Sequence, residues 1–167
     1  RVAPGARRAF AFQRLRHFDP AAWKRLLDAA RAGEAAVEEA GIFGSDISPV
    51  AVRATLANLD RAGLLPAVKL STGDLLDIDA PAARGILVSN PPYGERVSDH
   101  DELAEFYPLL GSALKRHFAG WNCYLISADT RLPKLVRLTP SRKTPLFNGA
   151  LECRLYEFRM VAGSNRA

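Results

Sequence analysis

The chain has 167 residues, of which 48% are hydrophobic and 25% charged, so it can form one globular domain with a sizeable core. No apolar run approaches the length of a membrane span, and the net charge of +5 favours an anionic partner only weakly. Cys123 and Cys153 lie in apolar, strand-like stretches without a Cys/His cluster. We therefore expect buried reduced thiols, no metal site and a cytoplasmic location.

Basic and aromatic residues alternate near the start of the chain, at Arg7, Arg8, Phe10, Phe12, Arg14, Arg16 and Phe18. Such a mixture suits contact with the RNA backbone together with stacking of bases. It suits equally well a solvated basic surface above aromatic residues that belong to a core. The sequence leaves both interpretations open.

Local signals predict the regular elements. Asp19-Pro20 and Ser48-Pro49 each combine an N-cap residue with a proline suited to the first helical turn, and Gly63 suits a helix end. In chain order we expect helices from residue 20 and from residue 49, a strand at 42–47, strands at 67–72 and 85–89, a helix at 101–118, a strand at 123–127 and a short helix at 130–137.

The last stretch, "TPLFNGALECRLYEFRMV", predicts two strands joined at Asn148-Gly149-Ala150. Its apolar alternation changes phase between Leu155 and Tyr156, which predicts a bulge or a change of the buried face. The continuous apolar run at 86–88 predicts burial on both faces, as in a parallel sheet. Alternating strands and helices followed by a hairpin predict an α/β fold, a doubly wound Rossmann-like sheet with an antiparallel C-terminal hairpin.

Polar residues stand where the predicted strands end. In doubly wound sheets ligands bind at the carboxyl ends of the strands, so Asp46, Asp74, Asn90 and Asp129 are expected along one rim. Asp46 could accept hydrogen bonds from both hydroxyls of a ribose. Asp74 could accept one from an adenine amine, while the Leu75 amide donates to a ring nitrogen. The alternative is that each carboxylate serves the backbone of its own turn.

The corner Asn90-Pro91-Pro92-Tyr93 directly follows a predicted buried strand. An exocyclic amine on a nucleobase is a poor nucleophile because its lone pair is delocalised into the ring. The Asn90 side-chain oxygen and the Pro91 carbonyl can accept its protons and aim the lone pair, while the prolines stiffen the backbone. Tyr93 can stack on the flat base. The alternative is a tight turn rich in turn-forming residues.

Three stretches together, "GSDISPVAVRATLANLDRAGL", "SNPPYGERV" and "LFNGALECRLYEF", resemble class I S-adenosylmethionine-dependent RNA methyltransferases. The resemblance is strongest to the bacterial 23S rRNA guanine-N2 methyltransferases, which carry an N-terminal THUMP RNA-binding domain. It covers nearly all of residues 1–167, which we therefore expect to form a single, partial methyltransferase domain. The Asn-Pro-Pro-Tyr motif alone is shared by adenine-N6, guanine-N2 and protein glutamine-N5 methyltransferases. The flanking "GER" and the tail "LFNGALEC" are what favour the guanine family.

The resemblance implies S-adenosyl-L-methionine as cofactor, 23S rRNA as substrate and a THUMP domain elsewhere in the protein. It implies that the cofactor is bound by Asp46 with Ile47, by Asp74 with Leu75, and by Asn90. It implies that the catalytic residues are Asn90, Pro91, Pro92 and Tyr93. The residues that contact the substrate would be Tyr93, Phe147 and Asn148.

One part of the family pattern is expected upstream of Arg1. The family has a first strand and a loop of the type Asp-x-x-Cys-Gly-Ser-Gly that hold the methionine end of the cofactor. Without them, residues 1–167 alone are expected to bind the cofactor weakly or not at all, and the sheet is expected to expose the edges beside the missing strand. An adenine-N6 methyltransferase and a non-catalytic RNA-binding domain remain the alternatives, and the oligomeric state stays open.

Overall fold

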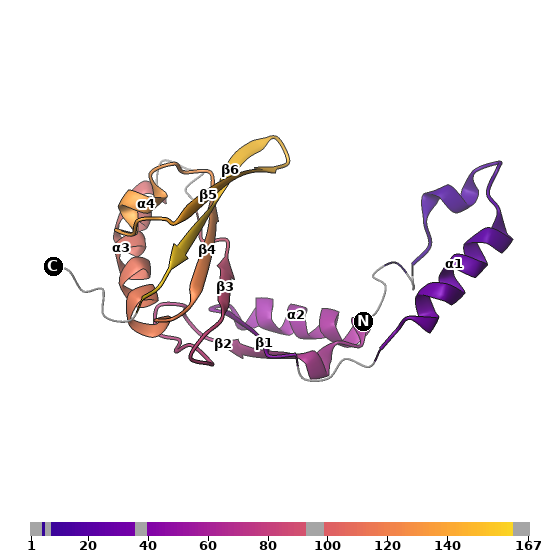
Figure 1. Ribbon diagram of the computed structural model, residues 1–167, viewed down its shortest axis with the longest axis horizontal. Coiled ribbons are helices and arrows are strands. Elements are labelled where there is room, and N and C mark those ends of the chain that lie inside the picture. Colours follow the sequence, from indigo (N-terminus) through magenta and orange to yellow (C-terminus); the bar gives the residue numbers. More distant parts are fainter. Residues whose placement is uncertain (1–4, 6–7, 36–39, 93–98, 162–167) are drawn as a thin grey trace. The chain divides into compact units, whose positions relative to one another are not determined.

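The computed structural model describes residue 5 and residues 8–35, 40–92 and 99–161. Its elements gather into two compact units, Arg1–Thr72 and Gly73–Ala167 (Figure 1). Among the described residues, none of the helices combines the length and the apolar character that crossing a bilayer requires. That residues 1–167 form a single domain stays a prediction.

The first unit contains η1 (Ala11–Arg14), α1 (Pro20–Ala32), β1 (Ile42–Asp46), α2 (Pro49–Ala62), η2 (Leu65–Ala67) and β2 (Val68–Thr72). Both predicted helix starts are confirmed. The Asp19 carboxylate accepts hydrogen bonds from two amides in the first turn of α1, and the Ser48 hydroxyl accepts one from the Ala51 amide in the first turn of α2. Gly63 ends α2 at a φ of 70°, a left-handed conformation that favours glycine.

β1 and β2 form a two-stranded parallel sheet in which Asp46 lies opposite Thr72. The carboxyl ends of the two strands therefore lie at the same edge. α2 connects the strands along the chain and packs against both of them. This arrangement places Asp46, the last residue of β1, at the edge where a parallel sheet is expected to bind its ligands.

The second unit contains β3 (Ile86–Ser89), α3 (Asp99–His117), β4 (Asn122–Ser127), α4 (Leu132–Leu135), β5 (Arg142–Asn148) and β6 (Leu151–Arg159). Its sheet has the strand order β3-β4-β6-β5 (Figure 1). β3 and β4 are parallel, and β6 is antiparallel to both of its neighbours. The predicted C-terminal hairpin is thereby confirmed, with Gly149 at a φ of 62° in its turn.

The core of the second unit lies between α3 and the sheet. Its fully buried side chains come from α3, β4, β6 and the α4 region, and include Tyr107, Leu110, Leu114, Cys123, Leu125, Leu132, Val136, Tyr156 and Phe158. Gly111 lets α3 lie close to the backbone at Val136, since a Cβ at position 111 would be 1.9 Å from the Val136 carbonyl oxygen. Cys123 and Cys153 are both free and buried, as expected.

The burial predicted for β3 is wrong. Ile86 and Val88 are 66% and 72% exposed, whereas Leu87, on the other face, packs against the core. β3 is an edge strand, and within the second unit the core covers only the Leu87 face. An apolar run in the sequence predicts a strand, but both faces of that strand are buried only where another element packs against each of them.

The change of phase in the last strand comes from a change of the buried face. The β5–β6 ladder keeps one register from Asn148 opposite Leu151 to Arg142 opposite Glu157. The register of β6 with β4 is equally regular. Along these described ladders the bulge is therefore excluded, and burial passes from Cys153 to Tyr156 and Phe158.

Candidate functional site

The Asn-Pro-Pro corner follows the carboxyl end of β3. Asn90 is exposed, the ring of Pro91 is buried, and Pro92 is exposed. The Pro92 carbonyl oxygen accepts a hydrogen bond from the Tyr107 hydroxyl at 2.7 Å. Tyr93 lies outside the described residues, so its role in stacking stays a prediction. The corner is thus tied to α3 through a backbone carbonyl.

Tyr107 is the residue at this site that sequence reasoning missed. Helical spacing assigns Tyr107 only to the apolar face of α3, and its ring does lie in the core with 1% of its surface exposed. Burial raises the pKa of its hydroxyl, the polar Ser127 side chain opposes the rise, and the negative charge of Asp129 adds to it. A tyrosine hydroxyl on a buried helix face needs a hydrogen-bond partner, and this requirement is the signal in the sequence that could have identified Tyr107.

The carboxyl end of β4 lies beside the carboxyl end of β3, because Ser89 is opposite Leu125 in a parallel ladder. Ser127 ends β4, and its hydroxyl accepts a hydrogen bond from the Asp129 amide at 3.0 Å. The Asp129 carboxylate accepts from the Arg131 amide at 2.7 Å and pairs with the Arg131 guanidinium at 2.9 Å. Asp129 therefore stands at the predicted edge and serves its own turn.

The tip of the hairpin extends past this same edge. Only residues 154–159 of β6 pair with β4, and Arg154 lies opposite Ser127 at the end of that strand. Phe147 and Asn148, which pair with the start of β6, therefore lie beyond the carboxyl end of β4. Phe147 is 74% exposed. The structure thus brings the two residues to the end of the sheet that carries the corner.

Asp46 stands exposed at the end of β1. One of its carboxylate oxygens accepts a hydrogen bond from the Ser48 amide at 2.8 Å, which is the alternative role considered from the sequence. Its other oxygen has no partner within the part of the chain that the structure describes. Ile47 is 70% exposed beside it. The carboxylate therefore serves its turn and still fits a ribose hydroxyl.

Asp74 follows β2 by two residues and is half-buried. One carboxylate oxygen accepts a hydrogen bond from the Leu76 amide at 2.9 Å, so Asp74 also closes its own turn. Its second oxygen has no partner in the described ranges of the chain. Leu75 packs against the core of the second unit. Asp74 can accept a further donor, as an adenine amine would require.

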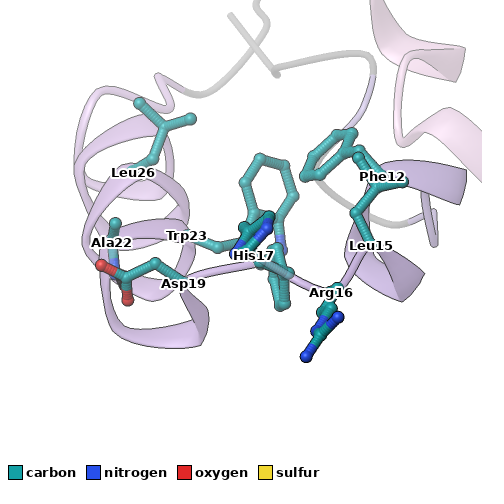
Figure 2. A pocket seen from close by; sticks show the side chains of 9 residues that line it. Phe12, Leu15, Arg16, His17, Asp19, Ala22, Trp23 and Leu26 are labelled. Carbon is teal, nitrogen blue, oxygen red and sulfur yellow. Dashed lines mark hydrogen bonds between the residues drawn. The ribbon is translucent and has the colours of Figure 1, made fainter.

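An aromatic hollow lies in the first unit, lined by η1, α1 and the loop between them (Figure 2). It is open, with a volume of about 810 Å³. The centroids of the Phe12 and Trp23 rings are 5.1 Å apart, and Phe18 lies 6.0 Å from Phe12. Arg16 and His17 contribute to its lining. Both interpretations of this stretch, stacking of bases and packing within a core, remain open.

No cluster of three metal-ligating side chains occurs in the described residues. The absence of a metal site stays a prediction.

Residues 1–157 match the family of RMKL-like methyltransferase domains. The chain belongs to this family. It is 35% identical over 169 residues to the ribosomal RNA large subunit methyltransferase K/L of Shewanella baltica, covering 99% of the chain and 24% of that relative. It is 34% identical over 160 residues to a candidate RNA methyltransferase of Synechocystis, covering 95% of the chain and 42% of the relative. The chain thus spans less than half the length of these relatives.

Solved structures confirm the predicted fold class. SMU.472, described as a candidate methyltransferase complexed with SAH, superimposes with a TM-score of 0.84 at 30% identity, covering 95% of this chain and 42% of that one. A protein of Clostridium difficile described as a possible methylase gives a TM-score of 0.83 at 25% identity, covering 99% of this chain and 44% of that one. The resemblance seen in the sequence motifs is therefore confirmed at the level of family and fold.

Proposed function

We propose that the protein containing this chain methylates the exocyclic N2 amine of a guanine in 23S rRNA. The observation that carries the proposal is the Asn90-Pro91-Pro92 corner, which stands at the carboxyl end of β3 in a member of a methyltransferase family. Its relatives include proteins named ribosomal RNA large subunit methyltransferases. A 23S rRNA substrate would place the protein in the bacterial cytoplasm, and a THUMP domain in the same protein would help to bind it.

S-adenosyl-L-methionine, bound to the protein, would supply an electrophilic methyl group. Asp46 would accept hydrogen bonds from its ribose, and Asp74 with the Leu75 amide would hold its adenine. The structure supports these roles because each carboxylate keeps one oxygen without a partner among the described residues. Ile47 offers an exposed apolar side chain beside Asp46.

The corner would hold the target amine. The Asn90 side-chain oxygen and the Pro91 carbonyl would accept its two protons, which leaves the nitrogen lone pair directed away from them. Such fixed acceptors lower the barrier by positioning and electrostatic preorganisation. The proton that the amine loses would pass to water, since the methylated, positively charged nitrogen is strongly acidic. The target base must be unpaired or flipped out of its stack to enter.

Phe147 and Asn148 would contact the RNA beside the target base. Phe147 presents an exposed ring at the same end of the sheet as the corner, and aromatic rings stack on unpaired bases. Guanine rather than adenine as the target is favoured by the residues that flank the shared motif, "GER" and "LFNGALEC". Mass spectrometry of the methylated nucleoside separates the two.

The test is the Asn90→Ala variant of the full-length protein, assayed for methyl transfer to unmodified rRNA. We expect kcat to fall more than about tenfold, as when one preorganised polar group is removed, with cofactor affinity largely kept because Asp46 and Asp74 would provide most of its binding. Asn122→Ala is the matched control, since Asn122 is exposed at the amino end of β4. Near-normal turnover by Asn90→Ala would contradict the role of the corner.

A further inference from the structure

The two prolines of the corner create a problem of anchoring. Pro91 and Pro92 have no backbone N–H, so neither can donate a hydrogen bond to a neighbouring strand. Their φ angles are fixed, but the orientation of the peptide groups on either side still depends on ψ. The two prolines can therefore be held only through their rings and their carbonyls. In the structure the Pro91 ring is buried, and the Pro92 carbonyl accepts the Tyr107 hydroxyl at 2.7 Å.

The Tyr107 hydroxyl also lies near the polar residues at the end of β4, since Ser127 and Asp129 both act on its pKa. The Asp129 amide donates to the Ser127 hydroxyl at 3.0 Å. The hydrogen of the Tyr107 hydroxyl is used on the Pro92 carbonyl, so toward Ser127 and Asp129 the Tyr107 oxygen can act only as an acceptor. Among the described residues, the hydrogen bond that the Tyr107 hydroxyl makes is the one to the Pro92 carbonyl of the corner.

Tyr107 and Ser127 stand on regular secondary structure inside the core of the second unit. Tyr107 and Ser127 are each 1% exposed. Tyr107 stands on the 19-residue helix α3, and Ser127 ends a strand that is paired on both sides. Burial raises the pKa of the Tyr107 hydroxyl, so it stays protonated and remains a donor at physiological pH. The anchor is thus available whenever the unit is folded.

We propose that Tyr107 is a positioning residue for methyl transfer, which orients the corner by holding the Pro92 carbonyl. The role rests on the proposed function of the corner as the acceptor of the target amine. Pro92 is bonded directly to Pro91, so fixing one end of Pro92 restricts how the Pro91 carbonyl and Asn90 can turn. Tyr107 touches neither substrate nor cofactor in this role, and acts through the backbone that it holds.

Tyr107→Phe in the full-length protein removes the hydroxyl and keeps the ring in the core. We expect kcat for methyl transfer to rRNA to fall about tenfold, with the KM for the methyl donor unchanged. Tyr156→Phe is the matched control. Tyr156 is also 1% exposed in the same core, and its hydroxyl interacts with Arg154 rather than with the corner. It loses a buried hydroxyl of the same kind and should keep kcat within about twofold of the wild type.

Amide hydrogen exchange gives a readout that does not depend on activity. Peptides that contain Ser89 and Asn90 should exchange faster in Tyr107→Phe than in the wild type or in Tyr156→Phe, because the corner has lost its anchor. A merely structural tyrosine would raise exchange throughout the core in both variants. Equal exchange of these peptides in all three proteins would overturn the inference.

The two assays separate this inference from the proposed function. If the wild type does not methylate rRNA but the corner peptides respond as expected, the proposed function fails and the anchoring stands. If the wild type is active and Tyr107→Phe matches Tyr156→Phe in kcat and KM, the positioning role fails and the function stands. Loss of kcat to the same extent in both variants would likewise overturn the role of Tyr107, since general destabilisation would then explain it.

Discussion

Replacing Gly111 by alanine tests the packing on which the corner depends. Gly111 lies one helical turn after Tyr107 on α3, and both face the core of the second unit. The alanine Cβ would lie 1.9 Å from the Val136 carbonyl oxygen and 2.8 Å from its carbonyl carbon. The neighbour is backbone, so no side chain can rotate away. To lengthen this distance from Cβ to carbonyl oxygen even to a tight 3.0 Å, α3 and the backbone at Val136 would have to move apart by more than 1 Å.

The loss of stability in Gly111→Ala depends on how far the segment opposite Gly111 can move. Leu132 and Val136 are 0% and 1% exposed, so the segment opposite Gly111 cannot move without disturbing the core. Overpacking of a core costs about 1–3 kcal/mol, and alanine regains up to about 1 kcal/mol of helix propensity over glycine. Because backbone rather than a side chain must move, we expect a net loss of about 2 kcal/mol. In a chain of this size that lowers the melting temperature by about 4–8 °C.

Thermal unfolding followed by circular dichroism measures this loss, and urea unfolding provides the corresponding free energy. Gly33→Ala is the matched control, since a Cβ there would meet its nearest neighbour at an ordinary 3.6 Å, and its φ is −85°. That variant should stay within about 0.5 kcal/mol of the wild type. Gly111→Ala should also lower methyl transfer per folded molecule, because α3 carries Tyr107. A Gly111→Ala protein as stable as Gly33→Ala would refute the close approach.

Two further predictions concern Cys123 and the aromatic hollow. Burial raises the pKa of Cys123 to about 12, so iodoacetamide at pH 8.5 should label it only after unfolding. The contribution of the buried Cys123 thiol to the free energy of unfolding should be complete below its ordinary pKa of 9.0 and should be lost as the pH rises toward about 12. The free energy of unfolding of Cys123→Ala should therefore decline less steeply at alkaline pH than that of the wild type. If the hollow stacks bases, Phe12→Ala should weaken binding of single-stranded RNA by about 1–3 kcal/mol in fluorescence anisotropy at fixed salt, whereas Leu56→Ala should not. Equal affinity of these two variants would favour the packing interpretation.

Helix starts and the hairpin could be predicted because their causes are local. Asp19 and Ser48 cap the helices that begin one residue later, and Gly149 supplies the positive φ of the turn. The burial of β3 could not be predicted in this way. Whether Ile86 and Val88 are covered depends on what packs against that face, and their side chains carry no information about it.

The candidate carboxylates show why a choice between two readings of one residue can be false. Asp46 and Asp74 each close their own turn through one oxygen, as the structural alternative predicted. Neither has a partner among the described residues for its second oxygen. The bond within the turn orients the carboxylate, and the orientation is what a ligand site requires. Capping thus prepares these residues for binding instead of excluding it.

Tyr107 was hidden from sequence reasoning for a related physical reason. Helical periodicity treats a tyrosine as an apolar ring, and that reading was correct for the ring, which is buried in the core. The hydroxyl follows a different rule, because in a buried position it must find a partner, and the partner here is 15 residues away along the chain. Only the tertiary fold, which places α3 beside the end of β3, joins the two. A tyrosine at a core position after a proline-rich corner that cannot donate hydrogen bonds is therefore a candidate anchor, and the comparison of Tyr107→Phe with Tyr156→Phe tests that argument directly.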